Sequence, residues 1–229
     1  MSERYDVVVV GVGGMGSAAL YHLASRGQRV LGLERFEVPH ERGSSHGLTR
    51  IIRQAYFEHP SYVPLVLRAY ELWRDLEAEA GEQLLFVTGA LEGGPRIFEG
   101  AVRSSVEHGL PYEELDGAEA ARRFPAFRLP PGLPLVFQRD GGFLLSERCI
   151  EAHVRGALAH GAELRTGERV LEWSAGENGV RVRTDRATVE AERLVLTAGA
   201  YSQAVARLPA GLVIPQRQVL AWLEPQRPE

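Results

Sequence analysis

The sequence predicts an α/β fold, and a few patterns along the chain indicate it. Residues 7–10 are consecutive valines, which is typical of a strand buried on both faces of a parallel sheet. A glycine-rich turn and a helical pattern of apolar residues over 18–24 follow directly. Residues 169–191 contain short segments in which polar and apolar side chains alternate, which predicts an antiparallel three-stranded meander. Together these features predict a Rossmann-like domain with a parallel sheet and a β-meander crossover.

The glycines after the first strand have the spacing of a dinucleotide site. Gly11, Gly13 and Gly16 form G-x-G-x-x-G where the strand gives way to a helix. In such a site the first glycine makes a tight turn, the second lets the backbone approach a pyrophosphate, and the third lets the helix pack on the strand. The helix N-terminus adds free N–H groups and a positive dipole end. We therefore expect Gly14 and Met15, in the same turn, to contact the cofactor as well.

An acidic residue follows the second predicted strand. Glu34 comes directly after the apolar run 30–33, where its carboxylate can accept hydrogen bonds from the hydroxyls of an adenosine ribose. The same charge would repel the 2′-phosphate of NADP. The motif therefore predicts FAD or NAD, with Arg35 expected to lie beside the cofactor.

Composition excludes several other classes of protein. The net charge is −4 and no basic run is present, so we expect no nucleic-acid partner. The lone cysteine, Cys149, rules out an internal disulfide framework and is expected to be a buried structural thiol. The histidines have no metal-ligand spacing, so we expect no metal. No apolar run approaches the ~20 residues of a membrane span. We therefore expect a cytoplasmic protein without a membrane partner.

The remaining elements follow from periodicity and from the residues that end them. An apolar stripe indicates a helix over 62–80, ended by Gly81, and it consists of Leu65, Ala69, Leu72, Trp73 and Leu76. Asp116 and Glu119 have the spacing of a capping box, and Ser146 is expected to cap a helix that extends to 160. Further helices are predicted over 97–108, after 116 and over 202–207. Further strands are predicted over 86–91, on either side of the turn 140–142, and over 162–166 and 216–223, and residues 193–200 are predicted to form a buried strand that runs into a small-residue turn.

Several motifs occur in an order that resembles a known family. The run Gly-Ser-Ser-His-Gly-Leu-Thr-Arg-Ile-Ile-Arg at 43–53, the helix start at 62–65 and the run 194–200 follow the glycine motif. In this order they resemble the flavin amine oxidases of the D-amino-acid oxidase superfamily, above all the monomeric sarcosine oxidases and N-methyl-amino-acid oxidases. The resemblance implies FAD as the cofactor, an FAD-binding domain over 1–80 and 145–212, and part of a mixed-sheet substrate domain over 81–144 and 213–229.

The resemblance also implies an activity and its residues. Oxidases of this family oxidise the C–N bond of a secondary or primary amino acid with dioxygen, which gives an imine and hydrogen peroxide. By analogy His46 and Arg50 lie beside the flavin ring, and Arg53 binds the substrate carboxylate. The alternative is that these are solvated loop residues. Where close relatives often carry a histidine pair, this chain has Ser45 before His46, so any role of the first histidine is absent.

Further cofactor contacts are implied in the same way. Ser44 and Ser45 belong to the shared run at 43–53. The main chain of Val170 is expected to lie beside the adenine. The turn formed by Thr197, Ala198 and Gly199 is expected to be a second place where the backbone approaches the cofactor.

Relatives of this family are well over a hundred residues longer, so we expect a fragment, a frame-shortened product or one half of a split enzyme. Self-association and contact with a missing C-terminal half stay open as partner interactions. Three functions remain: a flavin amine oxidase, a non-catalytic FAD-binding module, and an NAD-dependent dehydrogenase. The third is the weakest, since a nicotinamide domain has no need of the run at 43–53 or of the meander.

Overall fold

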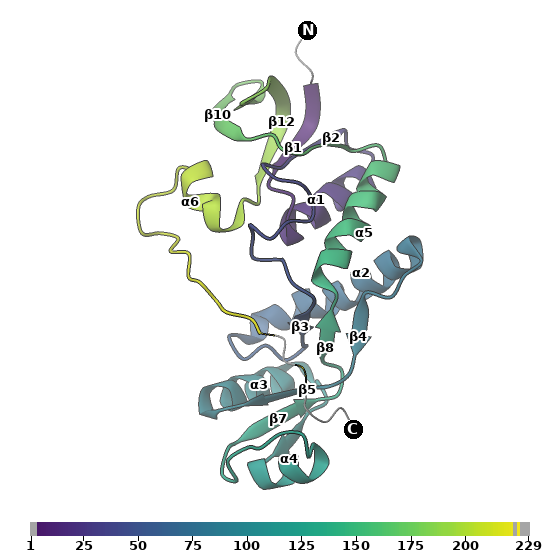
Figure 1. The fold of residues 1–229 in the computed structure, drawn as a ribbon, viewed down its shortest axis with the longest axis vertical. Coiled ribbons are helices and arrows are strands. Elements are labelled where there is room, and N and C mark those ends of the chain that lie inside the picture. The colour runs from purple at the N-terminus through teal and green to yellow at the C-terminus, as the bar shows by residue number, and fades with distance from the viewer. Residues whose placement is uncertain (1–3, 222–223, 225–229) are drawn as a thin grey trace.

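The structure is a computed structural model that describes residues 4–221 and 224. Figure 1 shows a large sheet at one end of the molecule, helices beside it, and two small sheets at the other end. The large sheet has six strands in the order β10-β11-β12-β1-β2-β9. Its strands are β1 (Arg4–Val10), β2 (Val30–Leu33), β9 (Glu163–Arg165), β10 (Val170–Gly176), β11 (Gly179–Thr184) and β12 (Thr188–Leu196).

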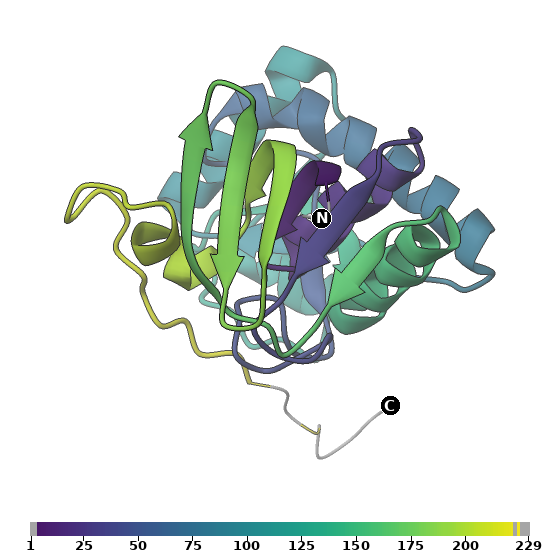
Figure 2. The same cartoon turned by 90° about the horizontal axis from the view of Figure 1, so that it is seen from above.

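The valines of β1 are buried on both faces of this sheet, as predicted. Val7 and Val9 pack in one cluster, which also contains residues of α1 (Gly14–Ala24) and α5 (Ser146–Ala159). Val8 and Val10 point the other way, into a cluster with side chains of the meander strands. Because side chains alternate along a strand, a run of valines is the pattern that a strand between two cores requires. Figure 2 shows the strands of the sheet side by side.

The meander prediction is confirmed, with one correction to its last strand. The sequence predicts a strand over 188–191 and a separate strand that runs into a small-residue turn within 193–200, but β12 is one continuous strand from Thr188 to Leu196. It pairs antiparallel with β11 from Thr188 to Ala191 and parallel with β1 from Glu190 to Leu196. Glu190 and Ala191 therefore have a partner strand on each side. In this way the meander joins the parallel sheet without a turn between them.

The helices are close to the predicted ones. In addition to α1 and α5 they are α2 (Val63–Ala80), α3 (Pro95–His108), α4 (Gly117–Arg123) and α6 (Ser202–Val205). Gly81 ends α2 in the left-handed conformation at φ 69°, and Asp116 caps α4 by accepting the Glu119 N–H at 2.8 Å. The predicted stripe of α2 is wrong at Leu65, which is 68% exposed. Ser146 does not cap α5, because its hydroxyl donates instead to the carbonyl of Gly47 at 2.8 Å.

Two three-stranded antiparallel sheets form the other end of the molecule. They have the orders β3-β8-β4 and β5-β7-β6. Their strands are β3 (Arg50–Ile52), β4 (Leu85–Val87), β5 (Ala90–Gly93), β6 (Glu113–Leu115), β7 (Leu135–Gln138) and β8 (Gly142–Leu144). The predicted strand over 86–91 is thus divided at Gly89, whose φ of 82° turns the chain from one sheet into the other. Strands do flank the turn 140–142, but they belong to different sheets.

The pairing of β3 and the conformation of residues 216–221 bear on the predicted domain division and on the last predicted strand. β3 lies in the predicted FAD-binding segment 1–80, yet it pairs with β8, which lies in the predicted substrate segment. The predicted strand over 216–223 is wrong for 216–221, which have no regular secondary structure, and 222–223 lie outside the described residues. No helix among the described residues combines the length and apolar character needed to cross a membrane.

Candidate dinucleotide-binding site

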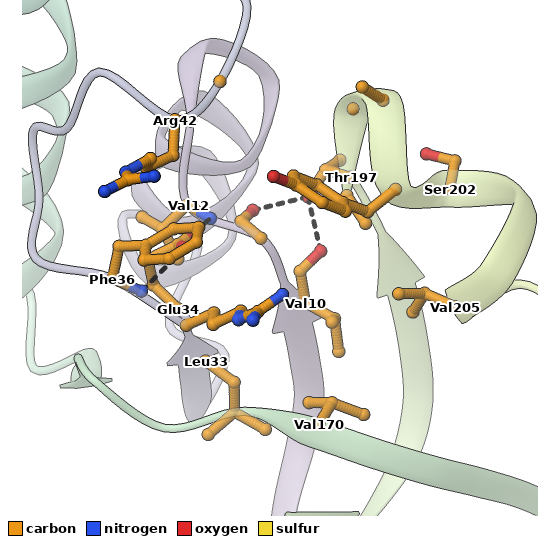
Figure 3. Close-up of a pocket in the computed structure, with 18 of the residues that line it drawn as sticks. Val10, Val12, Leu33, Glu34, Phe36, Arg42, Val170, Thr197, Ser202 and Val205 are labelled. Atoms are coloured by element: carbon orange, nitrogen blue, oxygen red, sulfur yellow. Dashed lines mark hydrogen bonds between the residues drawn. The ribbon is translucent and has the colours of Figure 1, made fainter. Parts of the chain in front are cut away.

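A cavity of about 760 Å³ opens at the carboxyl ends of β1, β2 and β12. Its walls are the glycine turn after β1, the loop 34–45, the segment 168–171 and the residues from 196 to 205. Figure 3 shows side chains from these four segments around the cavity. Ligands of open α/β sheets bind at this edge of the sheet, and the volume suits a cofactor-sized molecule.

The glycines of the turn have the conformations and the space that a dinucleotide needs. Gly11 has a φ of 91°, and a Cβ there would lie 2.7 Å from the carbonyl oxygen of Thr197. A Cβ on Gly16 would overlap the carbonyl oxygen of Gly11, so the start of α1 packs directly on the turn. Around Gly13 no atom beyond its chain neighbours lies within 4 Å of a Cβ position, which leaves room for a phosphate to approach the backbone.

Glu34 is buried at the base of the cavity and faces the glycine turn. Its Oε2 accepts the Val12 N–H at 2.8 Å, and its Oε1 accepts the Phe36 N–H at 3.1 Å. Only 6% of the residue is exposed. The dashed lines in Figure 3 mark both bonds. A buried carboxylate held by backbone donors keeps a fixed orientation, and its remaining acceptor capacity is available to a ligand hydroxyl.

The turn after β12 closes the opposite wall. The Thr197 hydroxyl lies 2.7 Å from the Gly11 carbonyl oxygen and 3.1 Å from that of Val10. This links the ends of the two central strands, as Figure 3 shows. Ala198 and Gly199 line the cavity next to it. The other predicted contacts that line the same cavity are Gly13, Gly14, Met15, Arg35, Ser44, Ser45 and Val170.

Ser45 reaches the start of α1. Its hydroxyl accepts the Gly14 N–H at 3.3 Å, one of the donors that would otherwise be free at a helix N-terminus. α1 has no side-chain cap from its own N-cap residue, Gly13. The hydroxyl of the 43–53 run therefore lies beside the predicted phosphate position.

His46, Arg50 and Arg53 do not line this cavity. The Arg50 guanidinium donates to three backbone carbonyls of its own loop, those of Ser44, His46 and Thr49, at 2.6 to 2.8 Å. In this arrangement Arg50 holds the loop 44–50 together. Ser44 and Ser45 of this loop line the cavity, whereas Arg50 does not.

The Arg53 guanidinium already has carboxylate partners. Its Nε lies 2.7 Å from Glu92 and its Nη2 lies 3.4 Å from Glu58. Gln138 donates to the other oxygen of Glu92 at 2.6 Å and accepts the Ala55 N–H at 2.8 Å. Burial raises the pKa of Glu92, although Arg53 opposes the shift. The structure therefore places Arg53 in a partly buried charged network.

Sequence reasoning missed His40, Arg42 and Phe36, which all line the cavity beside Glu34. His40 Nε2 lies 3.4 Å from Glu34 Oε1, and its Nδ1 accepts the Arg42 N–H at 3.0 Å. Its ring meets that of Phe36 edge-on, with centroids 5.0 Å apart. A histidine that bonds to the N–H two residues later gives little signal in a single sequence, because it resembles any polar loop.

The lone cysteine, Cys149, lies in the hydrophobic core. Cys149 is buried at 4% exposure, and burial raises the pKa of its thiol to about 12. The expectation of a buried structural thiol is thus confirmed. In the described part of the chain no group of three or more His, Cys, Asp or Glu side chains is placed to hold a metal ion.

The site thus defines a dinucleotide-binding α/β protein, and comparison with known proteins gives its family. The profile of the FAD-dependent oxidoreductase family named DAO matches residues 6–229. The chain therefore belongs to this family, whose description names FAD as its cofactor.

Individual relatives agree with the family. A monomeric sarcosine oxidase of Streptomyces avermitilis is 42% identical over 232 residues, which is 99% of this chain and 60% of the relative. An N-methyl-L-tryptophan oxidase of Yersinia pestis is 35% identical over 221 residues, 95% of this chain and 59% of the relative. NikD, an amino acid oxidase of nikkomycin biosynthesis, matches in structure with a TM-score of 0.81 at 34% identity, over 90% of this chain and 54% of NikD. The chain thus spans about 60% of the length of the sarcosine oxidases it matches.

Proposed function

We propose that this chain binds FAD in the cavity at the end of the large sheet and serves a sarcosine oxidase-like enzyme. The observation that carries the proposal is Glu34. Its buried carboxylate is held by the backbone at 2.8 and 3.1 Å and faces a glycine turn that has open space at Gly13. A carboxylate in this position suits the unphosphorylated ribose of FAD.

The residues of the cavity fit FAD as follows. Glu34 and Arg35 would hold the adenosine ribose, the turn 11–16 would hold the pyrophosphate, and the main chain at Val170 would lie beside the adenine. The turn 197–199 and the loop residues Ser44 and Ser45 would complete the contacts. Segments 1–80 and 145–212 would then make the FAD-binding domain, and 81–144 and 213–229 would be part of the substrate domain.

The proposed reaction is oxidation of a secondary or primary amino acid at its C–N bond, with dioxygen as the final acceptor. The flavin supplies the redox chemistry when it is bound, and the protein orients the reactants. By analogy with the family, His46 and Arg50 would lie beside the flavin ring. The Arg50 contacts support a role in shaping the loop that borders the cavity. Because one cysteine fits a reducing compartment, we propose a cytoplasmic location.

One observation favours a second candidate, a non-catalytic FAD-binding module. Arg53 is proposed to bind the substrate carboxylate, but its guanidinium is paired with Glu92 and Glu58. A substrate carboxylate would have to displace one of them or add a third negative charge. The oxidase and the non-catalytic module would both bind FAD, but only the oxidase would turn over a substrate.

Two measurements test the proposal. Isothermal titration of the purified chain with FAD and with NAD identifies the cofactor: binding of FAD is expected, and binding of NAD alone would refute the proposal. Peroxide release by the FAD-loaded protein with sarcosine or proline then separates oxidase from module. The size of the protein in solution reports whether it self-associates.

A further inference from the structure

His40 lines the wall of the cavity beside Glu34. Its side chain is 17% exposed. Three contacts fix the ring: Nε2 with Glu34, Nδ1 with the backbone of Arg42, and its edge with Phe36. Each partner lines the cavity in its own right.

The contact with Arg42 determines which ring nitrogen carries the proton. Nδ1 accepts a backbone N–H at 3.0 Å, so this nitrogen must present its lone pair. In the neutral ring the proton is then on Nε2, the nitrogen that faces Glu34 Oε1 at 3.4 Å. The turn at 40–42 thus places a protonated ring nitrogen beside the carboxylate.

The two carboxylate oxygens of Glu34 differ in their remaining capacity to accept hydrogen bonds. Oε1 accepts the Phe36 N–H and lies 3.4 Å from His40 Nε2, whereas Oε2 accepts only the Val12 N–H among the described residues. A carboxylate oxygen has two acceptor directions. Oε2, on the side of the glycine turn, therefore keeps capacity for a ligand hydroxyl.

We propose that His40 is a positioning residue of the cofactor site: through Nε2 it holds Glu34 Oε1, so that Oε2 stays oriented toward the sugar of the bound dinucleotide. This inference rests on the proposed FAD site. His40 acts through Glu34 and needs no contact of its own with the cofactor.

Two replacements of His40 distinguish the role of Nε2 from that of Nδ1. In His40→Gln the amide N–H₂ can reach the position of Nε2, whereas in His40→Asn the amide oxygen can replace Nδ1 in the turn but the side chain is too short to reach Glu34. His59→Ala is the matched control. His59 Nδ1 likewise accepts the N–H two residues later, that of Ser61 at 3.1 Å, but His59 does not line the cavity.

Isothermal titration with FAD is the first measurement. We expect His40→Asn and His40→Ala to weaken FAD binding about tenfold, because Glu34 Oε1 loses its contact with the ring nitrogen. His40→Gln and His59→Ala should stay within about threefold of the wild type. Wild-type affinity in His40→Asn together with a loss in His40→Gln would overturn the proposal, because the turn and not the carboxylate would then matter.

The second measurement needs no cofactor. A long-range ¹H–¹⁵N correlation spectrum of the ligand-free chain reports the tautomer of His40. We expect the proton on Nε2 and a change of this signal in Glu34→Gln. A proton on Nδ1 would overturn the proposal. If the wild type bound no FAD, the proposed function would fail, while the spectrum would still decide the His40–Glu34 contact.

Discussion

Replacing Glu34 by alanine tests the central feature of the site. The change removes the acceptor of two backbone N–H groups, those of Val12 and Phe36, and the acceptor offered to the ribose. A hydrogen bond to a charged group contributes about 1.5–3 kcal/mol. The loss of FAD affinity should therefore be about 10- to 150-fold.

The same change lowers the stability of the ligand-free chain by a smaller amount. Val12 is 1% exposed, so its N–H loses a buried partner, which costs about 1–3 kcal/mol. Water that enters the vacated space offsets part of this, and about 1–2 kcal/mol remains. For a chain of this size that corresponds to a fall in melting temperature of roughly 2–8 °C.

The assays are isothermal titration with FAD and thermal unfolding without it. Glu37→Ala is the matched control, because Glu37 lies in the same loop, is exposed and accepts a hydrogen bond from Thr166 at 2.9 Å outside the cavity. Its FAD affinity should equal that of the wild type. Unchanged affinity in Glu34→Ala would refute the assignment of the ribose to this carboxylate.

Three further changes give predictions for other parts of the fold. Gly11→Ala places a Cβ at φ 91° and 2.7 Å from the Thr197 carbonyl oxygen. We expect the free energy of unfolding, measured by thermal unfolding, to fall by more than about 2 kcal/mol, and FAD to bind weakly. A wild-type melting temperature would contradict this prediction. Thr197→Val removes the hydroxyl that links the ends of β1 and β12. Denaturant unfolding should show that the free energy of unfolding falls by about 1 kcal/mol. An unchanged value would mean that the hydroxyl does not stabilise the contact between the two strands. Burial lowers the pKa of His153 to about 4 in the folded state, so the unfolded chain binds the extra proton first and stability falls as pH drops from about 6.5 to 4. His153→Phe should remove roughly 2–3 kcal/mol of that fall in urea unfolding at the two pH values, and equal pH slopes in both proteins would show that His153 is not responsible.

The sequence predicts the parts of the fold in which local pattern and tertiary environment agree. The valines of β1 are predicted to be buried on both faces of a sheet, and they are. The glycine turn and Glu34 are predicted to lie at the end of this sheet, and both line the cavity there. The strands around Gly89 and the turn 140–142 were harder to predict. Their apolar content indicates strands correctly, but which sheet each strand joins depends on pairing with segments far away in the sequence.

The same distinction separates the predicted site residues. The predicted cofactor contacts depend on backbone geometry next to a recognisable motif, and most of them line the cavity. The charged residues of the 43–53 run are different, because a guanidinium can bind any nearby carbonyl or carboxylate. Arg50 binds its own loop, and Arg53 binds Glu92, a partner 39 positions away that no local pattern connects to it.

The network around Arg53 bears on its proposed role as the ligand of a substrate carboxylate. Glu92 is held in place by Gln138, whereas Glu58 is 43% exposed at its side chain and lies at the longer distance of 3.4 Å. An incoming carboxylate would therefore exchange more easily with Glu58 than with Glu92, since water can replace the partners of an exposed charge at lower cost. Arg53 would then bind a substrate through its outer edge while Glu92 keeps hold of Nε. An arginine that is already paired with a carboxylate attracts a second one less strongly than a free arginine does, so Glu92 would weaken the binding of an anionic substrate to Arg53.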